Sequence, residues 1–323
     1  MILVISWEGD EHAQAVMGEL ARLHAACYLL DLSRFPQDLQ LAMHYRPPNG
    51  REFLLRSNGP EVLSFAEVRA IWWRRPRHFQ IHREVSIASH QTFAYNEMLE
   101  AFAGLWQSLD AQWVNHPTRD DVAARKAYQL RVAQEVGLTI PATLITSSPV
   151  EARDFVAKRG IGHVVYKAFS ATEQAWRETR LLRQDELDLV DSVRFAPVIF
   201  QEYIQATVDL RVTIVGDEIF PAAIHSQESS YAIDFRMDMG SVRIEPLELP
   251  REVEDGLRAL MSRLGLVYGA VDMRLTPDGR YVFLEINPAG QWLFIEQRTG
   301  QPISAALARH LWSRDKDPGH VVQ

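Results

Sequence analysis

Short apolar runs and one helical pattern open this chain of 323 residues. Residues 1–6, 27–32 and 68–73 are mostly apolar, which predicts strands that are buried on both faces of a sheet. Residues 13–23, between the first two strands, carry apolar side chains at helical spacing. A strand, a helix and a strand in that order predict a parallel sheet with a right-handed crossover.

The remainder of the first 117 residues extends this pattern. Alternating apolar and polar residues at 39–45 and 52–56 flank a Pro-Pro-Asn-Gly turn, which predicts a hairpin. A long helix is expected at 85–109 and a short strand at 112–115. We therefore predict an N-terminal open α/β domain over residues 1–117, a length typical of one domain.

Beyond residue 117, strands and helices alternate again. Residues 118–136 are expected to form one amphipathic helix, with two aspartates in its first turn and Gly137 at its end. We predict two further α+β parts, a small central subdomain over 118–202 and a C-terminal subdomain over 203–323. Strands are expected at 142–145, 163–168, 197–204, 209–215, 218–225, 268–275 and 281–286, and helices at 149–158 and 250–264.

Three oxygen-bearing side chains lie at the last two of these strands. A Pro-Asp-Gly turn joins the strands, so a hairpin is expected to set Asp272 beside Glu285 and Asn287. Glu285 and Asn287 are two residues apart, and their side chains point to the same side of an extended strand. Carboxylate and amide oxygens are ligands that suit Mg²⁺. A solvated edge hairpin is the alternative, but unpaired carboxylates are costly within such apolar runs.

Two basic features lie outside this hairpin. Residues 72–83 are the most basic segment and carry Arg74 and Arg75, whose guanidinium groups suit carboxylates and phosphates. They follow a predicted parallel strand, where such sheets bind ligands, although a solvated loop explains them equally well. Lys167 lies in an apolar strand and needs an anionic partner, unless it lies at the strand end and reaches water.

Composition and charge exclude several classes of protein. A net charge of −8 argues against a general nucleic-acid binder. No apolar run approaches the roughly 20 residues of a membrane span, and the N-terminus lacks the basic segment of a signal peptide. Cys27 is the only cysteine, so no internal disulfide is expected and the cytoplasm is the expected location.

Six separated sequence elements together resemble the ATP-grasp superfamily. Each is weak alone, but their order over about 160 residues is specific. The resemblance implies an α/β chain of the ATP-grasp fold, with a pre-ATP-grasp domain in front and ATP held between the central and C-terminal subdomains. The elements are Lys126, Lys167, QEYI at 201–204, DLR at 209–211, DMR at 272–274 and EIN at 285–287.

The resemblance implies a role for each element. Two lysines contact the ATP phosphates, a hinge strand meets adenine through its backbone, and an acidic residue holds the ribose. Arginines offset the negative charge that develops when the γ-phosphoryl group moves to a carboxylate. By this resemblance the roles fall to Lys126 and Lys167 (phosphates), Gln201, Glu202, Tyr203 and Ile204 (adenine), Asp209 (ribose), Asp272, Glu285 and Asn287 (Mg²⁺, with Asn287 also near the nucleotide), and Arg211 and Arg274 (catalysis).

A narrower resemblance is to the graspetide synthetases, the microviridin-type ATP-grasp peptide maturases. It rests on WWRRP at 72–76, residues 209–227, DFR at 234–236 and EINPAGQWLFIE at 285–296. Those enzymes join Asp or Glu side chains of a ribosomal precursor peptide to Ser or Thr hydroxyls or to Lys amines, and a leader peptide docks on their central domain. The resemblance implies ATP, Mg²⁺, a precursor-peptide partner and a homodimer. The candidate substrate residues are Arg74, Arg75, Arg236, Gln291 and Trp292.

Two alternative functions share these elements. One is a RimK-like ATP-grasp ligase that joins amino acids to a small molecule or to a protein C-terminus. The other is a peptide-binding protein with a relic nucleotide site. One departure from the superfamily concerns residues 169–180, which lack the glycines that many ATP-grasp enzymes place over the phosphates. Ser170, Thr172 and Arg177 are the candidates to replace them.

Overall fold

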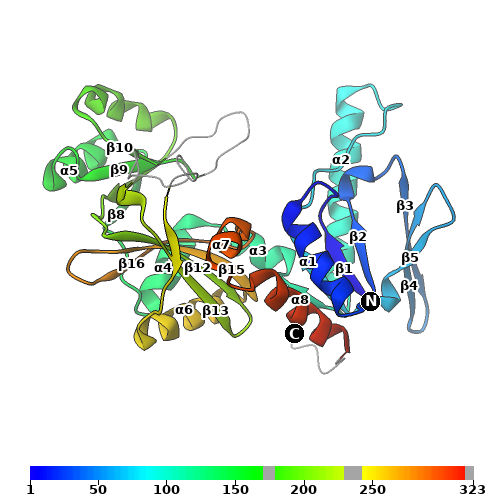
Figure 1. The fold of residues 1–323 in the computed structure, drawn as a ribbon. Helices are drawn as coiled ribbons and strands as arrows, with labels where there is room; N and C mark the ends of the chain where they lie inside the picture. Colours follow the sequence, from blue (N-terminus) through cyan, green and yellow to red (C-terminus); the bar gives the residue numbers. More distant parts are fainter. Residues whose placement is uncertain (170–178, 229–241, 317–323) are drawn as a thin grey trace. The chain divides into compact units, whose positions relative to one another are not determined.

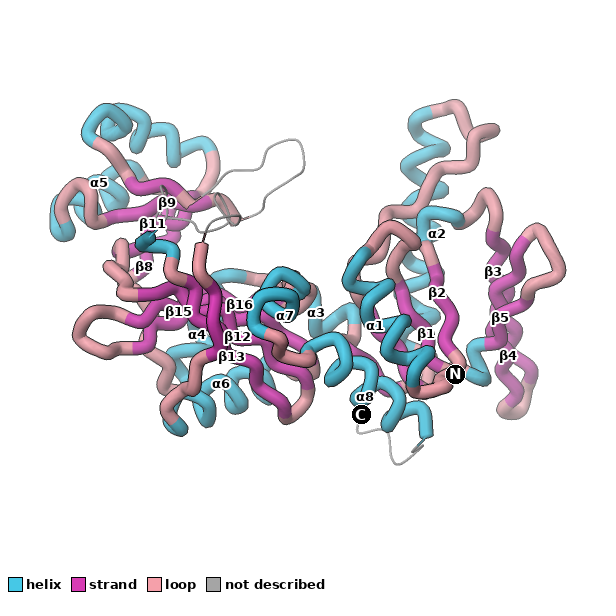
Figure 2. Tube along the Cα trace, in the orientation of Figure 1, coloured by secondary structure: helices cyan, strands magenta, loops and turns pink. Residues whose placement is uncertain are grey.

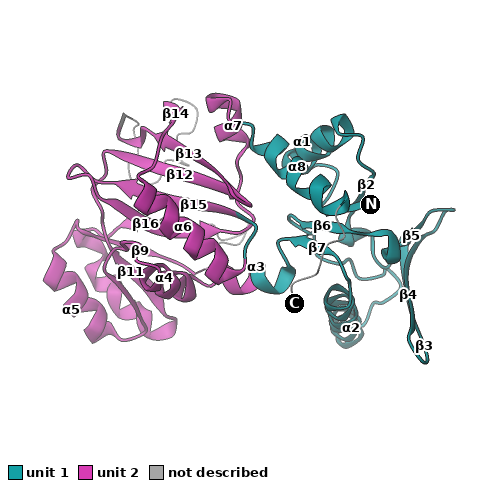
Figure 3. Cartoon of the chain, turned by 90° about the horizontal axis from the view of Figure 1, so that it is seen from below, with its two compact units in different colours: residues 1–120, 266–268, 302–323 teal, residues 121–265, 269–301 magenta. Residues whose placement is uncertain are grey.

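The chain forms two compact units (Figure 1, Figure 3). The computed structural model describes residues 1–169, 179–228 and 242–316. The first unit comprises residues 1–120, 266–268 and 302–323, and the second comprises residues 121–265 and 269–301. No helix in the described part of the chain is both long enough and apolar enough to cross a membrane.

A parallel sheet forms the centre of the first unit. β1 is buried along its whole length, as expected for a strand that is covered on both faces. Figure 3 shows α1 and α8 on one side of this sheet and α2 on the other. The predicted strand-helix-strand opening and its parallel pairing are confirmed. The elements are β1 (Ile2–Ile5), β2 (Cys27–Leu30), β6 (Ala70–Trp73) and β7 (Gln112–Val114), in the order β2-β1-β6-β7, with α1 (Glu11–Arg22), α2 (Ala88–Gln107) and α8 (Ile303–Lys316).

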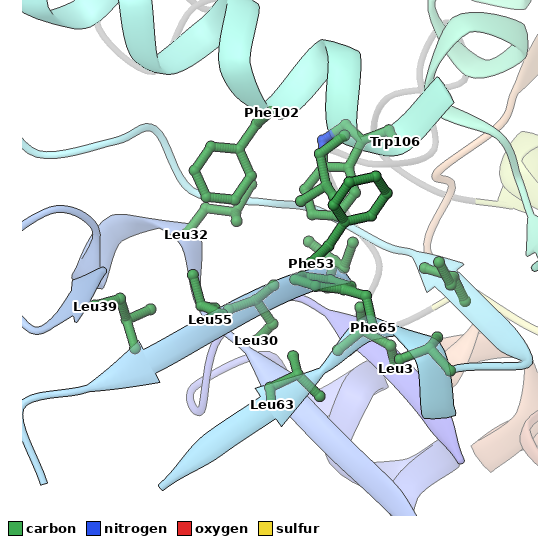
Figure 4. Close-up of a cluster of buried hydrophobic side chains, with 14 of the residues drawn as sticks. Leu3, Leu30, Leu32, Leu39, Phe53, Leu55, Leu63, Phe65, Phe102 and Trp106 are labelled. Atoms are coloured by element: carbon green, nitrogen blue, oxygen red, sulfur yellow. The ribbon is translucent and has the colours of Figure 1, made fainter. Parts of the chain in front are cut away.

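Aromatic side chains of α2 complete the core of the first unit. Figure 4 shows Phe102 and Trp106 pointing from α2 toward leucines of the strands and of the segment after β2. The predicted hairpin is confirmed as β3 (Leu39–Arg46) and β4 (Gly50–Ser57), and β5 (Val62–Ser64) pairs with β4. These strands add Phe53 and neighbouring leucines to the same cluster, so one core joins the hairpin to the parallel sheet.

The second unit contains a small antiparallel sheet with the order β10-β9-β11-β8. Ser148 caps α5 by accepting from the Glu151 N–H, and Pro149 is the first helical residue, where a missing N–H costs nothing. Ala152 and Val156 of α5 pack on Val164 and Phe200 of the sheet. The elements are β8 (Thr143–Thr146), α5 (Pro149–Arg159), β9 (Val164–Lys167), β10 (Arg180–Leu181), a 3-10 segment (Gln184–Phe195) and β11 (Val198–Glu202).

A larger sheet of the second unit has the order β14-β13-β12-β15-β16 (Figure 3). Figure 2 shows β12, β13, β15 and β16 of this sheet in magenta. α6 has a regular apolar stripe, and it ends where Gly265 adopts a left-handed conformation with φ of 68°. α4 contacts both α6 and β16. The remaining elements are β12 (Val208–Val215), β13 (Glu218–Ile224), β14 (Ile244–Pro246), α6 (Arg251–Leu264), β15 (Tyr268–Leu275), β16 (Tyr281–Asn287) and α7 (Leu293–Thr299).

The prediction of one continuous helix over residues 118–136 is wrong. The structure has α3 (Pro117–Ala123) and α4 (Lys126–Glu135), separated by Arg125 with an extended backbone (φ −75°, ψ 105°). The Ala123 carbonyl accepts at 2.7 Å from Nε2 of Gln129, a side-chain hydrogen bond across the break that helical periodicity does not reveal. Lys126 therefore lies at the first residue of a helix instead of in the middle of one.

The chain passes from the small sheet to the larger sheet between β11 and β12. The predicted boundary between residues 202 and 203 falls in this connection. The first unit also includes residues 266–268 and 302–323, which lie far along the sequence from the rest of it. The division into domains at 1–117, 118–202 and 203–323 stays a prediction.

Candidate functional site

Asp272 and Glu285 lie directly opposite each other on the antiparallel strands β15 and β16. The predicted hairpin is therefore confirmed, and so is its register at these two carboxylates. Ala270 lies opposite Asn287, whose Oδ1 accepts a hydrogen bond at 2.9 Å from the N–H of Ala289. Asn287 is thus an exposed side chain that caps the turn after β16, and its role as a metal ligand stays a prediction.

Each of these two carboxylates is paired with a basic side chain. The Lys126 ammonium donates to Oε2 of Glu285. Arg211 Nη1 donates to Oδ1 of Asp272 at 2.7 Å. Partly buried carboxylates are costly when unpaired, so the two cations stabilise the acidic pair within the fold. The arrangement brings two positive and two negative side chains together over a short length of hairpin.

A pocket in the second unit collects most of the predicted nucleotide-binding residues. Its empty volume is about 700 Å³, open solvent at its mouth included. Strands of both sheets line it, with apolar and charged side chains interleaved. The lining residues are Val165, Lys167, Thr179, Gln201, Glu202, Tyr203, Ile204, Asp209, Leu210, Asp272, Met273, Arg274, Leu284 and Glu285.

The predicted adenine-binding segment leads from β11 toward the larger sheet. The backbone N–H of Tyr203 donates to the His163 carbonyl at 2.9 Å, and the N–H of Glu202 donates to the Ala142 carbonyl at 2.9 Å. The Ile204 carbonyl accepts from Nη1 of Arg274 at 2.7 Å. Because these backbone groups already form hydrogen bonds within the protein, an adenine ring would have to bind to other backbone groups of the segment, such as the N–H of Ile204.

Asp209 and Arg274 form a buried ion pair beside that segment. Nε of Arg274 donates to Oδ1 of Asp209 at 2.7 Å, and Ser226 Oγ donates to the other carboxylate oxygen. Burial raises the pKa of Asp209, which Arg274 and Ser226 oppose. The Arg274 guanidinium also lies over the Tyr203 ring, 5.2 Å from its centroid. Arg274 thus connects the predicted adenine-binding segment to β12. The role of Asp209 in binding the ribose and the catalytic role of Arg274 stay predictions.

The turn after β16 approaches Arg211 closely. Nη2 of Arg211 donates to the Gln291 carbonyl at 2.9 Å. A Cβ on Gly290 would lie 2.9 Å from the same Nη2 and 2.3 Å from the Cβ of Ala270, so a side chain does not fit there. Gly290 therefore allows the turn to hold Arg211 against Asp272.

The pocket includes residues that sequence reasoning did not select. Val165 lies two positions before Lys167, so strand alternation places both on one face and was a usable signal. Leu284 lines the pocket because β16 has a β-bulge: Asp272 pairs with Glu285, whereas Met273 pairs with Phe283. No sequence pattern indicated that bulge. Thr179, Leu210 and Met273 carry no chemistry that marks them in the sequence.

The predicted substrate residue Arg74 is buried in the first unit, 2% exposed, and pairs with Asp10 (Nε to Oδ2 3.3 Å). Burial opposes ionisation of Asp10, but hydrogen bonds from His12 and Ser6 and the charge of Arg74 hold its pKa well below the ordinary range. Arg75, the next residue, is exposed. Substrate roles for both arginines stay predictions, and Arg74 would reach a peptide only after rearrangement.

The other predicted substrate residues differ in their surroundings. Trp292 is fully buried at the start of α7, where its carbonyl accepts from the N–H of Ile295 at 2.8 Å. Gln291 is exposed, and its backbone contacts Arg211. Neither lines the pocket, so their substrate roles stay predictions. Arg236 and the loop candidates Ser170, Thr172 and Arg177 lie outside the described residues.

The donor set of the hairpin fits a hard divalent cation together with a nucleotide. In the described ranges, no group of three or more His, Cys, Asp or Glu side chains could hold a metal ion. The predicted set contains two carboxylates and one amide. Mg²⁺ commonly takes one or two carboxylates and completes its shell with phosphate oxygens and water, so Asp272 and Glu285 suffice beside a bound triphosphate. Lys126, Lys167 and Arg211 carry positive charge, which phosphates attract, and their roles at a nucleotide stay predictions.

Comparison with known domain families covers nearly the whole chain. Residues 1–121 match the MvdD pre-ATP-grasp domain, and residues 123–311 match the RimK-like ATP-grasp domain. The chain is an ATP-grasp ligase. The predicted ATP-grasp fold and its pre-ATP-grasp domain are confirmed.

Known proteins place this ATP-grasp ligase among the graspetide synthetases. It is 30% identical to macrocyclase MdnC from Microcystis aeruginosa MRC, solved with precursor peptide MdnA, over 97% of this chain and 99% of that chain, with a TM-score of 0.84. It is 26% identical to a RiPP-associated ATP-grasp ligase from Chryseobacterium gregarium, solved with ADP and a leader and core peptide, over 97% and 96% of the two chains, with a TM-score of 0.87. A probable alpha-L-glutamate ligase from Enterobacter sp. (strain 638) is 28% identical over 73% of this chain and 78% of that protein.

Proposed function

We propose that this ATP-grasp ligase activates Asp or Glu side chains of a ribosomal precursor peptide and cyclises them onto Ser or Thr hydroxyls or Lys amines. One observation carries the proposal. The chain is 30% identical to a peptide macrocyclase over 97% of its length with a TM-score of 0.84, and this likeness includes residues 1–121, which match the MvdD pre-ATP-grasp domain. The products are an ester or an amide, ADP and phosphate.

The pocket of the second unit is the proposed place of this chemistry. Bound Mg·ATP supplies the phosphoryl group that turns a peptide carboxylate into an acyl phosphate, which the hydroxyl or amine then attacks with loss of phosphate. Asp272 and Glu285 would hold the metal, with Asn287 as the proposed third ligand. Lys126 and Lys167 would neutralise the phosphates, and Arg211 and Arg274 would offset charge at the reacting carboxylate.

The ion pairs that Asp272 and Glu285 make suit this proposal. Lys126 and Arg211 occupy the carboxylates that a metal would take. Metal binding would release both cations, and each would then lie next to the incoming phosphate oxygens. Each carboxylate would then pair with the metal and each cation with a phosphate, so no charge would be left unpaired, which limits the cost of desolvation.

Mass spectrometry of a precursor peptide tests the proposal. The purified ligase is incubated with ATP, Mg²⁺ and a candidate precursor encoded beside its gene, with a leader and an acidic core rich in Ser, Thr or Lys. Stepwise loss of one water per ring, with release of ADP, is the expected result. ATP turnover with free glutamate and none with peptide would instead favour the amino-acid ligase.

Two further properties belong to the proposal. The ligase would work in the cytoplasm, where ATP and newly made ribosomal peptides are both available. It would form a homodimer, as the resemblance to the graspetide synthetases implies. Light scattering should then report about twice the chain mass of 36.9 kDa, and a mass near that of one chain would contradict a dimer.

A further inference from the structure

The side chain of Gln129 connects three segments of the second unit. It lies in α4 and is 3% exposed. Nε2 donates to the Ala123 carbonyl at 2.7 Å and to the Ile286 carbonyl at 2.8 Å. Oε1 accepts from the N–H of Ile286 at 3.2 Å. Both amide hydrogens and the amide oxygen of one side chain are therefore used, each by a main-chain group.

The position of Ile286 gives these hydrogen bonds their significance. β16 is the last strand of the larger sheet, and on its outer edge the Thr139 carbonyl accepts from the N–H of Phe283 at 2.8 Å without continuing as a strand toward Ile286. Ile286 lies between Glu285 and Asn287, two of the proposed metal ligands. The Gln129 amide engages both the N–H and the C=O of this residue, as a paired strand would. Gln129 therefore fixes the outer edge of β16 where the metal ligands lie.

The same side chain also sets where α4 begins. The Ala123 carbonyl is the last of α3, and its hydrogen bond with Gln129 bridges the break before Lys126. Lys126 and Gln129 are three residues apart and share a helix face. That face is turned to β16, because Lys126 pairs with Glu285 while Gln129 binds Ile286. One amide thus couples the start of α4 to the strand of the acidic residues.

We infer that Gln129 is a positioning residue for the metal and phosphate site: it holds Lys126 on α4 in register with Glu285 and Asn287 on β16. The inference rests on the proposed function only for the identity of the ligands, Mg²⁺ and a nucleotide. Removing a group that orients metal ligands commonly lowers metal affinity or activity by about 10- to 100-fold.

Two substitutions in α4, Gln129→Met and Gln134→Met, distinguish the loss of the Gln129 amide from the general effect of replacing a glutamine in this helix. Methionine keeps the length of the glutamine side chain and removes its amide. Gln134 is exposed on the same helix and serves as the matched control. Hydrogen exchange of a peptide spanning residues 284–287 reports the N–H of Ile286, and thermal shifts with ADP over a series of Mg²⁺ concentrations report the ligand site.

For Gln129→Met we expect faster exchange in this peptide and about a 10- to 100-fold higher Mg²⁺ concentration for half-maximal stabilisation by ADP. Gln134→Met should match the wild type in both measurements. Unchanged exchange, or unchanged Mg²⁺ dependence despite faster exchange, would overturn the inference. Neither measurement requires peptide turnover. If the protein proves not to cyclise peptides, the two measurements still test the role of Gln129.

A second variant covers the case in which Gln129→Met does not fold. Gln129→Glu has the same shape, but its ionised form loses both donors and sets a negative charge against two carbonyls. Protonation restores one donor, and burial favours the protonated form. Even the protonated form has one donor where the Ala123 and Ile286 carbonyls use two, so we expect Gln129→Glu also to need a higher Mg²⁺ concentration than the wild type for half-maximal stabilisation by ADP. A Mg²⁺ dependence equal to that of the wild type would contradict a positioning role.

Discussion

Lys126 and Glu285, separated by 159 positions in the sequence, form an ion pair within the second unit. Lys126 is available for this pair because α4 begins at this residue, and Glu285 is presented by an edge strand that α4 contacts. The pair explains how a carboxylate is stabilised inside an apolar strand. It also gives Lys126 two successive partners in the proposed reaction, first Glu285 and then the phosphates.

Lys126→Met should weaken ATP binding more than it slows the bound reaction. The substitution removes a positive charge from the phosphate site and leaves Glu285 without its cation. We expect the KM for ATP to rise by about tenfold or more, which corresponds to one charge-assisted hydrogen bond. Steady-state ADP release with varied ATP measures it. Lys158→Met, at an exposed position of α5, is the control and should behave as the wild type.

Asp272→Asn and Glu285→Gln should each remove most of the ligase activity. A neutral amide keeps the shape of the site but weakens the hold on the cation that offsets phosphoryl charge. We expect a loss of about 100-fold or more in kcat, as for removal of a group that stabilises a transition state. Asp278→Asn, in the exposed turn of the same hairpin, is the matched control. Comparable rates for Asp272→Asn and Asp278→Asn would exclude Asp272 as a ligand.

Asn287→Ala should abolish turnover and leave the fold intact. The exposed side chain caps the N–H of Ala289, so its removal costs about 1 kcal/mol of stability and no core contact. Circular dichroism measures the fold, and ADP release measures turnover. Asn287→Asp keeps an oxygen for both the cap and the cation, and it should retain part of the activity. Full activity in Asn287→Ala would remove Asn287 from the metal site.

Gly290→Ala should displace Arg211. The added Cβ meets Nη2 of Arg211 at 2.9 Å and the Ala270 Cβ at 2.3 Å, so the turn or the guanidinium has to move. A shift of about 1 Å in such a group costs about 100-fold in rate. Gly104→Ala is the control, because a Cβ at that exposed position of α2 meets nothing within 4 Å. It should be neutral or stabilising by about 0.5–1 kcal/mol, since alanine favours helices.

Asp10 should make the stability of the first unit depend on pH. The fold lowers the pKa of Asp10 below its ordinary value of 3.8, so its contribution is present above that pH and is lost as the pH falls further. Asp10→Asn removes the negative charge that pairs with the buried Arg74, which should cost about 3 kcal/mol at pH 7. Thermal unfolding of the two proteins should differ clearly at pH 7 and less below about pH 4.

The control for that measurement is Asp38→Asn. Asp38 and Arg34 form an exposed pair with N and O 3.7 Å apart, and such pairs contribute little. A difference between Asp10→Asn and wild type that stayed constant down to pH 3 would show that the carboxylate charge is not what stabilises this cluster.

The sequence by itself determined the order of the elements, the parallel sheet of the first unit and the hairpin that sets Asp272 beside Glu285. Those features depend on local physics: alternation places side chains on one face, apolar runs bury strands, and Pro, Asp and Gly make turns. The proposed chemistry of the site came from the order of these residue types and their resemblance to the ATP-grasp superfamily, and it stays a prediction.

Only the tertiary structure decided how those residues are held. The burial of Arg74 and the hydrogen bonds of Gln129 to Ile286 depend on contacts between segments far apart in the sequence. The break before Lys126 and the bulge at Leu284 are backbone irregularities that no sequence pattern marked. Helical periodicity continued through residues 124 and 125, yet the backbone at Arg125 is extended, and the Gln129 side chain binds both the Ala123 carbonyl and the distant strand residue Ile286. Local propensity is worth tenths of a kcal/mol per residue, and a buried hydrogen-bonded network outweighs it.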